Sequence, residues 1–363
     1  MTIAEAATPA RPHRRNTRFW VHLSIGVVLA AIGLVVTVNL AGGIGDAVEA
    51  LRDLDARWLL VAVGCETVSY VLLSWQLRYL AGHQADLSPE AAMRLGLVVY
   101  GLGLITPASP AEGMVLASAE LRRRGLNRRR AVLALGFSEW FSTGALYLLA
   151  AVNVLFAAAL GDIPRAERAP LIVVAAVIIA TLAALAALLR RRSVVERGAV
   201  LIGALRPARS RKSVDERRAI GARWYAEARS LIGNRRHQTV AVSLALAAWI
   251  ADALCLFFAL RAAGASVDAD VLLLAYTAGV IAAEVPLLPA GLGLVETAMP
   301  AVLRSFGVPY STALAGSLAY RALGTFLPAL AGALVLPSLR VVRRHPNDET
   351  STDEWDPAPP AQG

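Results

Sequence analysis

Seven ionisable side chains stand within or beside stretches of sequence that are otherwise apolar enough to cross a membrane. They are Glu66, Glu139, Asp252, Glu284 and Arg321 near the centres of such stretches, and Glu112 and Glu296 where prolines and glycines interrupt them. An ionisable group at membrane depth costs about 2.5–3.5 kcal/mol on insertion scales and usually marks a functional site. Because the acids outnumber the bases, carboxylates remain that can bind protons or a cationic head group.

Arg321 is the most deeply placed base in the second half of the chain, since apolar and small residues surround it. A buried arginine needs a carboxylate or a phosphate as its partner. Glu139 holds the equivalent position in the first half, so we nominate it as the partner of Arg321. The alternative reading is a static ion pair that only holds the two halves together.

The apolar stretches identify the solvent of this protein. The chain has 363 residues, of which 56% are hydrophobic, and its mean hydropathy is +0.55. A helix that spans a bilayer needs about 20 apolar residues, and six stretches qualify: 20–40, 58–80, 131–160, 171–189, 239–260 and 312–335. We therefore expect an all-α polytopic membrane protein with about six full transmembrane helices.

The distribution of charge predicts the orientation. The net charge is +9, and the basic residues gather in four places: the N-terminus, 122–130, 190–236 and 340–344. The positive-inside rule puts these places, and both termini, in the cytoplasm, which indicates the cytoplasmic membrane. No motif indicates nucleic-acid binding. Two cysteines imply neither a disulfide framework nor a metal site.

Two further apolar segments are broken by prolines that stand three residues apart: Pro107 and Pro110, then Pro286 and Pro289. Each piece is too short to cross the membrane, so we predict two re-entrant pairs of half-helices. The new half-helices begin near Ala111 and near Gly291. Free N–H groups at such helix starts favour an anion. Plain helix kinks are the alternative reading.

The two halves follow one plan. Gly125 and Gly307 hold matching positions, as do Glu139 and Arg321, and the charge rule gives the halves opposite orientations. This is the inverted-repeat pattern of many transporters, whose sites lie where broken helices meet. The expected organisation is a basic N-terminus 1–18, a membrane domain 19–344 with repeats 57–160 and 238–340 around a cytoplasmic segment 190–237, and a disordered acidic tail 345–363.

The second half carries a family resemblance. The stretch "PLLPAGLGLVETAMPAVLRSFGVPYSTALAGSLAYRALGTFLP" holds a Pro-x-Gly-x-Gly-x-x-Glu turn, then Gly-Val-Pro, then Tyr320-Arg321. It resembles the transmembrane-domain family of lysylphosphatidylglycerol synthase. In the first half the family's Gly-Glu appears in reversed order, as Glu112-Gly113. The resemblance covers roughly 23–344 and implies the lipid-translocating half of such a synthase, without its aminoacyl-transferase domain.

These observations lead to an expected function. We expect a flippase-like translocator, not an enzyme, that moves an anionic or lysyl-modified phospholipid or a polyprenyl phosphate without a cofactor or metal; a homo-oligomer is left open. The expected substrate-binding residues are Glu112, Gly113, Glu139, Glu284, Pro289, Gly291, Gly293, Glu296, Tyr320 and Arg321.

Two other functions remain open at this point. One is a membrane glycosyltransferase, or its accessory subunit, that acts on a polyprenyl carrier. Its support is two Asp-x-Asp motifs, at Asp53–Asp55 and Asp268–Asp270, which are also common helix caps. The other is a scaffold for the cell envelope that transports nothing.

Overall fold

The fold is helical throughout the part of the chain that the structure describes. A computed structural model gives residues 52–82, 85–102, 110–160, 165–204, 213–283, 291, 293–335 and 338–339. The predicted first span, 20–40, and the predicted tail, 345–363, lie outside these residues.

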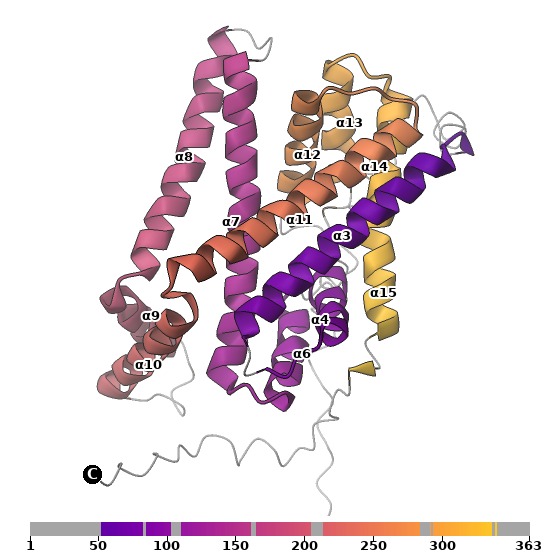
Figure 1. Cartoon of the computed structure of the whole chain (residues 1–363). Coiled ribbons are helices and arrows are strands. Elements are labelled where there is room, and N and C mark those ends of the chain that lie inside the picture. Colours follow the sequence, from indigo (N-terminus) through magenta and orange to yellow (C-terminus); the bar gives the residue numbers. More distant parts are fainter. Residues whose placement is uncertain are drawn as a thin grey trace, which may run out of the picture.

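Among the described residues, four helical runs are long and apolar enough to cross a membrane. They are α3 (Ala56–Ala81), α7 (Arg128–Leu160), α11 (Arg235–Ala262) and the continuous run of α14 (Tyr310–Arg321), η4 (Ala322–Phe326) and α15 (Leu327–Val335). These runs cover four of the six predicted spans. Helices α3 and α11 pack side by side, and α7 packs against both of them (Figure 1). The protein is therefore a multi-pass membrane protein.

Helix α8 (Arg165–Leu189) contains the fifth predicted span, with a shorter apolar stretch at Ile172–Leu188. It packs against α7 and turns large apolar side chains outward: Val173 is 60% exposed and Val177 is 58% exposed. Apolar side chains exposed to this degree along a helix suit a lipid environment, in which they carry no hydration penalty.

Local sequence explains where the long helices begin. The side chain of Asp55 accepts a hydrogen bond of 2.8 Å from the backbone N–H of Arg57 and so caps α3. Asn234 caps α11 through Arg236 in the same way, at 2.9 Å. Such caps satisfy N–H groups that have no partner within the helix. The first Asp-x-Asp motif therefore includes a helix cap.

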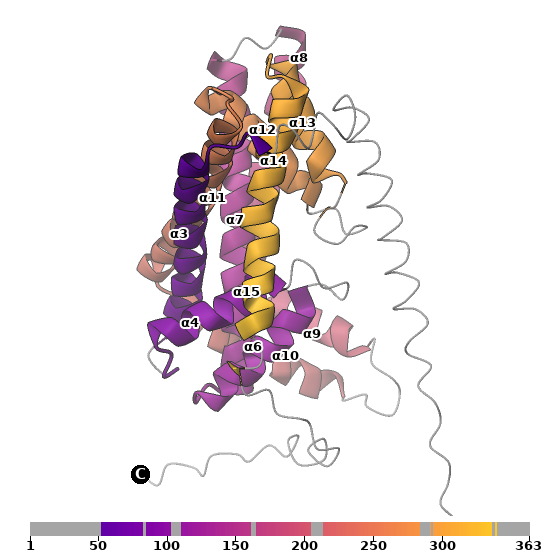
Figure 2. The same cartoon turned by 90° about the vertical axis from the view of Figure 1, so that its right-hand side faces the viewer.

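The two predicted half-helix pairs are separate short helices at opposite ends of the bundle. The first comprises α4 (Pro89–Gly96), the π-helical η1 (Leu97–Leu102) and α6 (Pro110–Arg123); the second comprises α12 (Ala269–Ala283) and α13 (Val295–Ser305). Figure 1 places α4 and α6 at the lower end and α12 and α13 at the upper end, and Figure 2 agrees. Pro107, Pro286 and Pro289 lie outside the described residues.

The turns after α6 and α13 have the same construction. Gly125 and Gly307 adopt positive φ angles of 95° and 89°. The N–H group that follows each glycine reaches back across the turn, from Leu126 to the Leu121 carbonyl at 3.2 Å and from Val308 to the Leu303 carbonyl at 3.1 Å. This pattern closes a helix on a left-handed residue, a conformation that glycine adopts without strain. The matching positions noted in the sequence thus have matching turns.

Two hydrophobic cores correspond to the two ends. One core joins α12, α13 and α14 to the middle and end of α11 and includes Leu256, Tyr276 and Met299. The other joins α4, η1 and α6 to the end of α3 and the start of α7 and includes Leu77, Leu95 and Leu121. Each short helix pair is therefore held by its own packing contacts.

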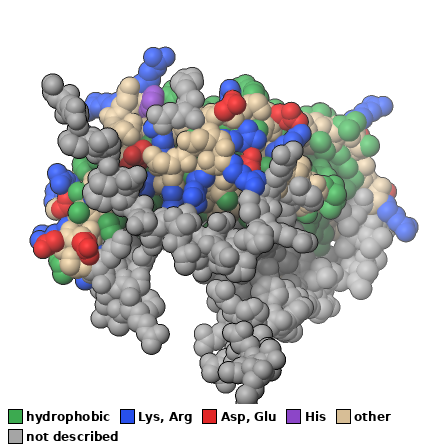
Figure 3. Space-filling model, turned by 90° about the horizontal axis from the view of Figure 1, so that it is seen from below, with side chains coloured by type: hydrophobic (Ala, Val, Ile, Leu, Met, Phe, Trp, Pro, Cys, Tyr) green, Lys and Arg blue, Asp and Glu red, His purple; other side chains and the backbone are tan. Residues whose placement is uncertain are grey.

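The lower end also carries α9 (Arg192–Ala204) and α10 (Val214–Ile232), from the predicted cytoplasmic segment. A capping box between Ser213 and Glu216 begins α10. Seen from below, this end shows many arginine side chains (Figure 3). It is the end that the positive-inside rule assigns to the cytoplasm.

Candidate functional site

A buried ion pair stands at the end of α14. The Arg321 side chain is 6% exposed, and its Nε lies 3.1 Å from Oε1 of Glu296, whose side chain is 9% exposed. Arg321 also donates from Nη1 to the hydroxyl of Thr325 at 3.0 Å. The guanidinium carbon lies 6.0 Å from the centre of the Phe326 ring. Glu296 on α13 and two residues of the following turn η4 thus surround the arginine.

Glu296 stabilises the start of α13 as well as binding Arg321. Its second oxygen, Oε2, accepts a hydrogen bond of 2.7 Å from the backbone N–H of Gly293. The hydroxyl of Thr297 donates to the Gly293 carbonyl at 2.8 Å. A carboxylate in the first turn of a helix is favoured by the free N–H groups and the helix dipole. The start of α13, which the proline and glycine residues before it create, therefore stabilises a negative charge at Glu296.

A second polar contact adjoins this pair. Asp252, from the apolar interior of α11, is 7% exposed. Its Oδ2 accepts hydrogen bonds from the hydroxyl of Tyr276 on α12 at 2.5 Å and from that of Tyr320 on α14 at 3.0 Å. Four helices, α11 to α14, therefore contribute polar groups to one region. Tyr320 was expected in the site and Asp252 was not, although an acid within an apolar span was the signal for it.

Glu139 is not the ion-pair partner of Arg321 within the described residues; that partner is Glu296. Glu139 is half-buried on α7 and accepts a hydrogen bond from Thr143 on the same helix at 3.2 Å. Equivalent positions in two halves need not touch, whereas α13 packs directly against α14. The nomination of Glu139 is therefore corrected.

The remaining expected residues are described to different extents. Gly291 and Gly293 lie in the turn before α13 with positive φ angles of 62° and 85°. Glu112 and Gly113 lie in the first turns of α6, where the structure describes the helix and not these side chains. Glu284 and Pro289 lie outside the described residues. The structure thus brings Gly291, Gly293, Glu296, Tyr320 and Arg321 to the region where the start of α13 meets the end of α14.

A polar network also crosses the first half. Ser138 on α7 contacts the hydroxyl of Tyr100 at 2.6 Å and donates to Gln76 on α3 at 3.2 Å. Gln76 in turn donates to the backbone carbonyl of Ala241 on α11 at 2.9 Å. These neutral groups satisfy one another inside the protein, as buried polar groups must. They gave no clear signal in the sequence.

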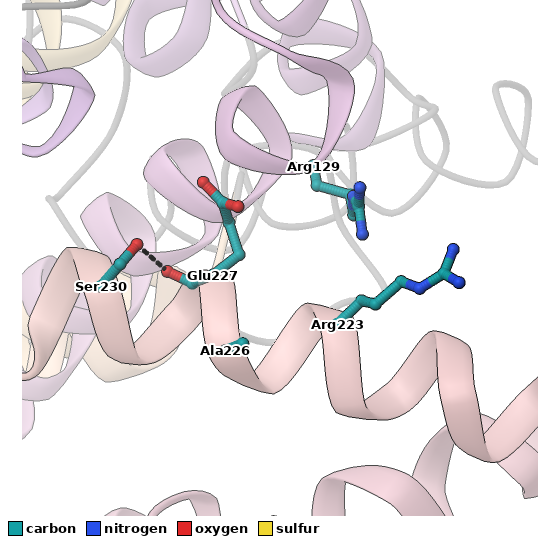
Figure 4. A pocket seen from close by; sticks show the side chains of 5 residues that line it. All are labelled: Arg129, Arg223, Ala226, Glu227 and Ser230. Atoms are coloured by element: carbon teal, nitrogen blue, oxygen red, sulfur yellow. Dashed lines mark hydrogen bonds between the residues drawn. The ribbon is translucent and has the colours of Figure 1, made fainter. Parts of the chain in front are cut away.

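A pocket of about 480 Å³ lies at the basic end, between α7 and α10. Figure 4 shows Arg129 and Arg223 on facing sides of it, with the Ser230 hydroxyl donating to the Glu227 carbonyl at 2.7 Å. Nη1 of Arg130 on α7 lies 4.0 Å from Oε1 of Glu227 on α10. The contact between Arg130 and Glu227 joins α7 to α10 beside this pocket, which the sequence did not predict.

Comparison with known families identifies the membrane domain. A family described as "Lysylphosphatidylglycerol synthase TM region" matches residues 23–332. The chain belongs to this family. The resemblance seen in the sequence is thereby confirmed. The match extends over α3, α7, α11 and both short helix pairs and ends at residue 332, within α15. A search of curated proteins finds no match.

Membership of the lysylphosphatidylglycerol synthase TM family indicates a function related to membrane lipids. The turn that the family resemblance singled out, from Gly291 to Glu296, is the turn that contributes the carboxylate of the buried ion pair. Tyr320 and Arg321, the Tyr-Arg pair of the resemblance, supply the groups that bind Asp252 and Glu296. The family motif and the buried polar cluster are therefore the same part of the molecule.

Proposed function

We propose that this protein translocates a phospholipid or a polyprenyl-phosphate-type lipid across the cytoplasmic membrane and is not an enzyme. The observation that carries the proposal is the ion pair between Arg321 and Glu296, which is buried among apolar helices at the start of a half-helix. A buried ion pair is costly to assemble and is weak evidence for stability. Its presence inside the membrane domain therefore favours a role in binding.

Arg321 can bind a lipid head group if the lipid phosphate takes the place of the Glu296 carboxylate. An arginine binds a phosphate through two parallel hydrogen bonds, as it binds a carboxylate. A lipid phosphate that reaches Arg321 would replace Glu296, which remains stabilised by the N–H of Gly293 and the start of α13. Glu296 would also be free to attract a cationic part of the same head group. The site thus suits a zwitterionic or lysyl-modified lipid.

The placement of the short helix pairs supports movement by rearrangement of two halves. The pairs lie at opposite ends of the long helices (Figure 2), and their closing turns share one hydrogen-bond pattern. Inverted repeats of this kind let one bundle rock against the other around a central site. We propose that the α4–α6 pair faces the cytoplasm and that the α12–α13 pair faces the outside.

Reconstitution tests the function directly. Liposomes that contain the purified protein and a fluorescent lipid are expected to lose more fluorescence to an impermeant quencher than protein-free liposomes, because inner-leaflet lipid reaches the outer leaflet. Head groups of several charges are compared in parallel, including a lysyl-modified and an anionic one. The proposal fails if no lipid moves faster than in protein-free liposomes and the purified protein retains no lipid.

Labelling of introduced cysteines tests the arrangement of the halves. Cys65 and Cys255 are first replaced by alanine, and single cysteines are then placed at Arg124 and at Gly307. In intact cells, an impermeant thiol reagent is expected to label Gly307→Cys, whereas Arg124→Cys becomes labelled only after the membrane is opened. Labelling of both positions in intact cells, or of neither, contradicts the inverted arrangement.

A further inference from the structure

Two carboxyl groups that are not part of the Arg321–Glu296 ion pair lie together between α3 and α11. Glu66 on α3 is 6% exposed and Asp252 on α11 is 7% exposed. A Cβ atom added to Gly324 would lie 3.6 Å from Oδ1 of Asp252 and 3.6 Å from the carboxyl carbon of Glu66. Both acids therefore border one small space, which is closed by the backbone of η4.

The hydrogen-bond donors around this space are distributed unequally. Asp252 accepts from the hydroxyls of Tyr276 and Tyr320, and Arg321 attracts it electrostatically. In contrast, Oε2 of Glu66 is fully buried without a hydrogen-bond partner among the described residues. A buried carboxylate oxygen without donors is strongly unfavourable when it carries charge. Of the two acids, Asp252 is therefore the better placed to carry a negative charge, with Glu66 neutral.

Of the other groups that face the pair, the thiol of Cys255 is a weak donor to Glu66, and it does not match the two tyrosine hydroxyls that bind Asp252. These other groups are Tyr70 and Cys65 on α3, Cys255 on α11, Tyr276 on α12, and Tyr320 and Arg321 on α14. Arg321 is the one cation of this set, and its ion pair is with Glu296. Tyr70 donates its hydroxyl to the carbonyl of Gly324 at 3.4 Å and so supplies no donor to Glu66 by that bond.

We propose that Glu66 and Asp252 form a proton-binding site in which Glu66 holds one exchangeable proton beside an ionised Asp252. Two adjacent carboxyls that are shielded from water cannot both ionise without strong repulsion, so they hold one proton between them. The ligand of this site is the proton, and Glu66 is its carrier.

Because the site lies next to η4, gain or loss of the proton can change the position of this turn. Gly324 lies inside η4, a π-helical turn between α14 and α15, and π-helical turns are frequent at functional sites. Loss of the proton from Glu66 places a second negative charge against this turn, which favours its movement away from α3. The link from this movement to lipid transport rests on the proposed function, whereas the proton site itself does not.

Infrared difference spectroscopy of the purified protein tests the site without any transport measurement. At neutral pH, the wild type is expected to show the carbonyl band of a protonated carboxyl, and Glu66→Gln is expected to lose it. Glu90→Gln is the control, because Glu90 is a 73% exposed carboxylate on α4 and its removal is expected to leave the band unchanged. A spectrum of Glu66→Gln identical to that of the wild type at every pH overturns the proposal.

A second variant guards against a folding defect in the first. Asp252→Asn removes the neighbouring negative charge, so the band of Glu66 is expected to persist and to disappear at a lower pH than in the wild type. Loss of the band in Asp252→Asn but not in Glu66→Gln would place the proton on Asp252 and refute the assignment. Displacement of the band by sodium, with choline as the comparison, would show a metal-cation site instead and would also refute it.

Coupling is then measured in the liposomes that test lipid movement. A proton gradient is expected to change the rate of lipid movement by the wild type and to leave the rate of Glu66→Gln unchanged. If the infrared band is present but the proton gradient does not change the wild-type rate, the proposed coupling is wrong. The proton site and lipid translocation are not contradicted by that result. The two failures are therefore distinguishable.

Discussion

Replacing Arg321 with methionine is expected to reduce lipid movement in liposomes by at least about tenfold, which corresponds to about 1.4 kcal/mol on a barrier. The variant is also expected to be less stable by about 3–5 kcal/mol, because it leaves Glu296 as an uncompensated buried charge. The unfolding temperature in detergent and the rate of fluorescence loss measure the two effects. Taken alone, this variant does not separate a binding role from a structural one.

The double variant Arg321→Met with Glu296→Gln makes that separation. It removes both charges and keeps a side-chain oxygen that can accept from the N–H of Gly293. Because loss of a whole buried pair is often nearly neutral, stability is expected to return close to that of the wild type, while lipid movement stays low. Recovery of lipid movement together with stability would show that the pair is static and that Arg321 does not contact the lipid.

Arg304→Met is the matched control for these variants. Arg304 is an exposed arginine at the end of α13, and its guanidinium carbon lies 5.8 Å from the centre of the Tyr310 ring. The same chemical change there is expected to leave stability and lipid movement close to those of the wild type. A loss as large as that of Arg321→Met would mean that the total number of arginines matters and not the buried site.

The sequence predicted the long helices well because their signal is local. Runs of apolar residues gave α3, α7, α11 and the α14–α15 run, and the polar residue before a helix gave caps such as Asp55. The breaks before α6 and α13 were visible because proline removes an N–H donor and glycine permits a turn. Each of these signals needs only a few neighbouring residues.

Contacts between helices could not be predicted in the same way. Equivalence of the two halves suggested Glu139 for Arg321, whereas the packing of α13 on α14 brings Glu296 to it. Glu66 and Asp252 are far apart in sequence and meet because α3 and α11 pack along their length. The π-helical turns η1 and η4 also left no sequence signal, since their wider hydrogen-bond spacing depends on the surrounding helices.

Gly291 lies in the break before α13 and packs closely against the end of α12. Gly291→Ala is therefore expected to be among the most destabilising single substitutions. Its φ angle of 62° costs an L-residue about 1–2 kcal/mol. An added Cβ would also lie 2.5 Å from the Cα of Ala283 and 3.0 Å from the carbonyl oxygen of Ala282. The end of α12 would have to move, and overpacking of this kind costs about 1–3 kcal/mol more.

Gly307→Ala separates these two contributions, because Gly307 has a positive φ angle of 89° and nothing within 4 Å of an added Cβ. It is expected to show only the conformational part of the loss in unfolding temperature. Gly291→Ala is expected to show a larger loss together with slower lipid movement, since the displaced turn carries the N–H that holds Glu296. Equal losses of unfolding temperature in the two variants would mean that the end of α12 can move at Ala283 at little cost. The close contact between Gly291 and Ala283 would then not be what positions the ion pair.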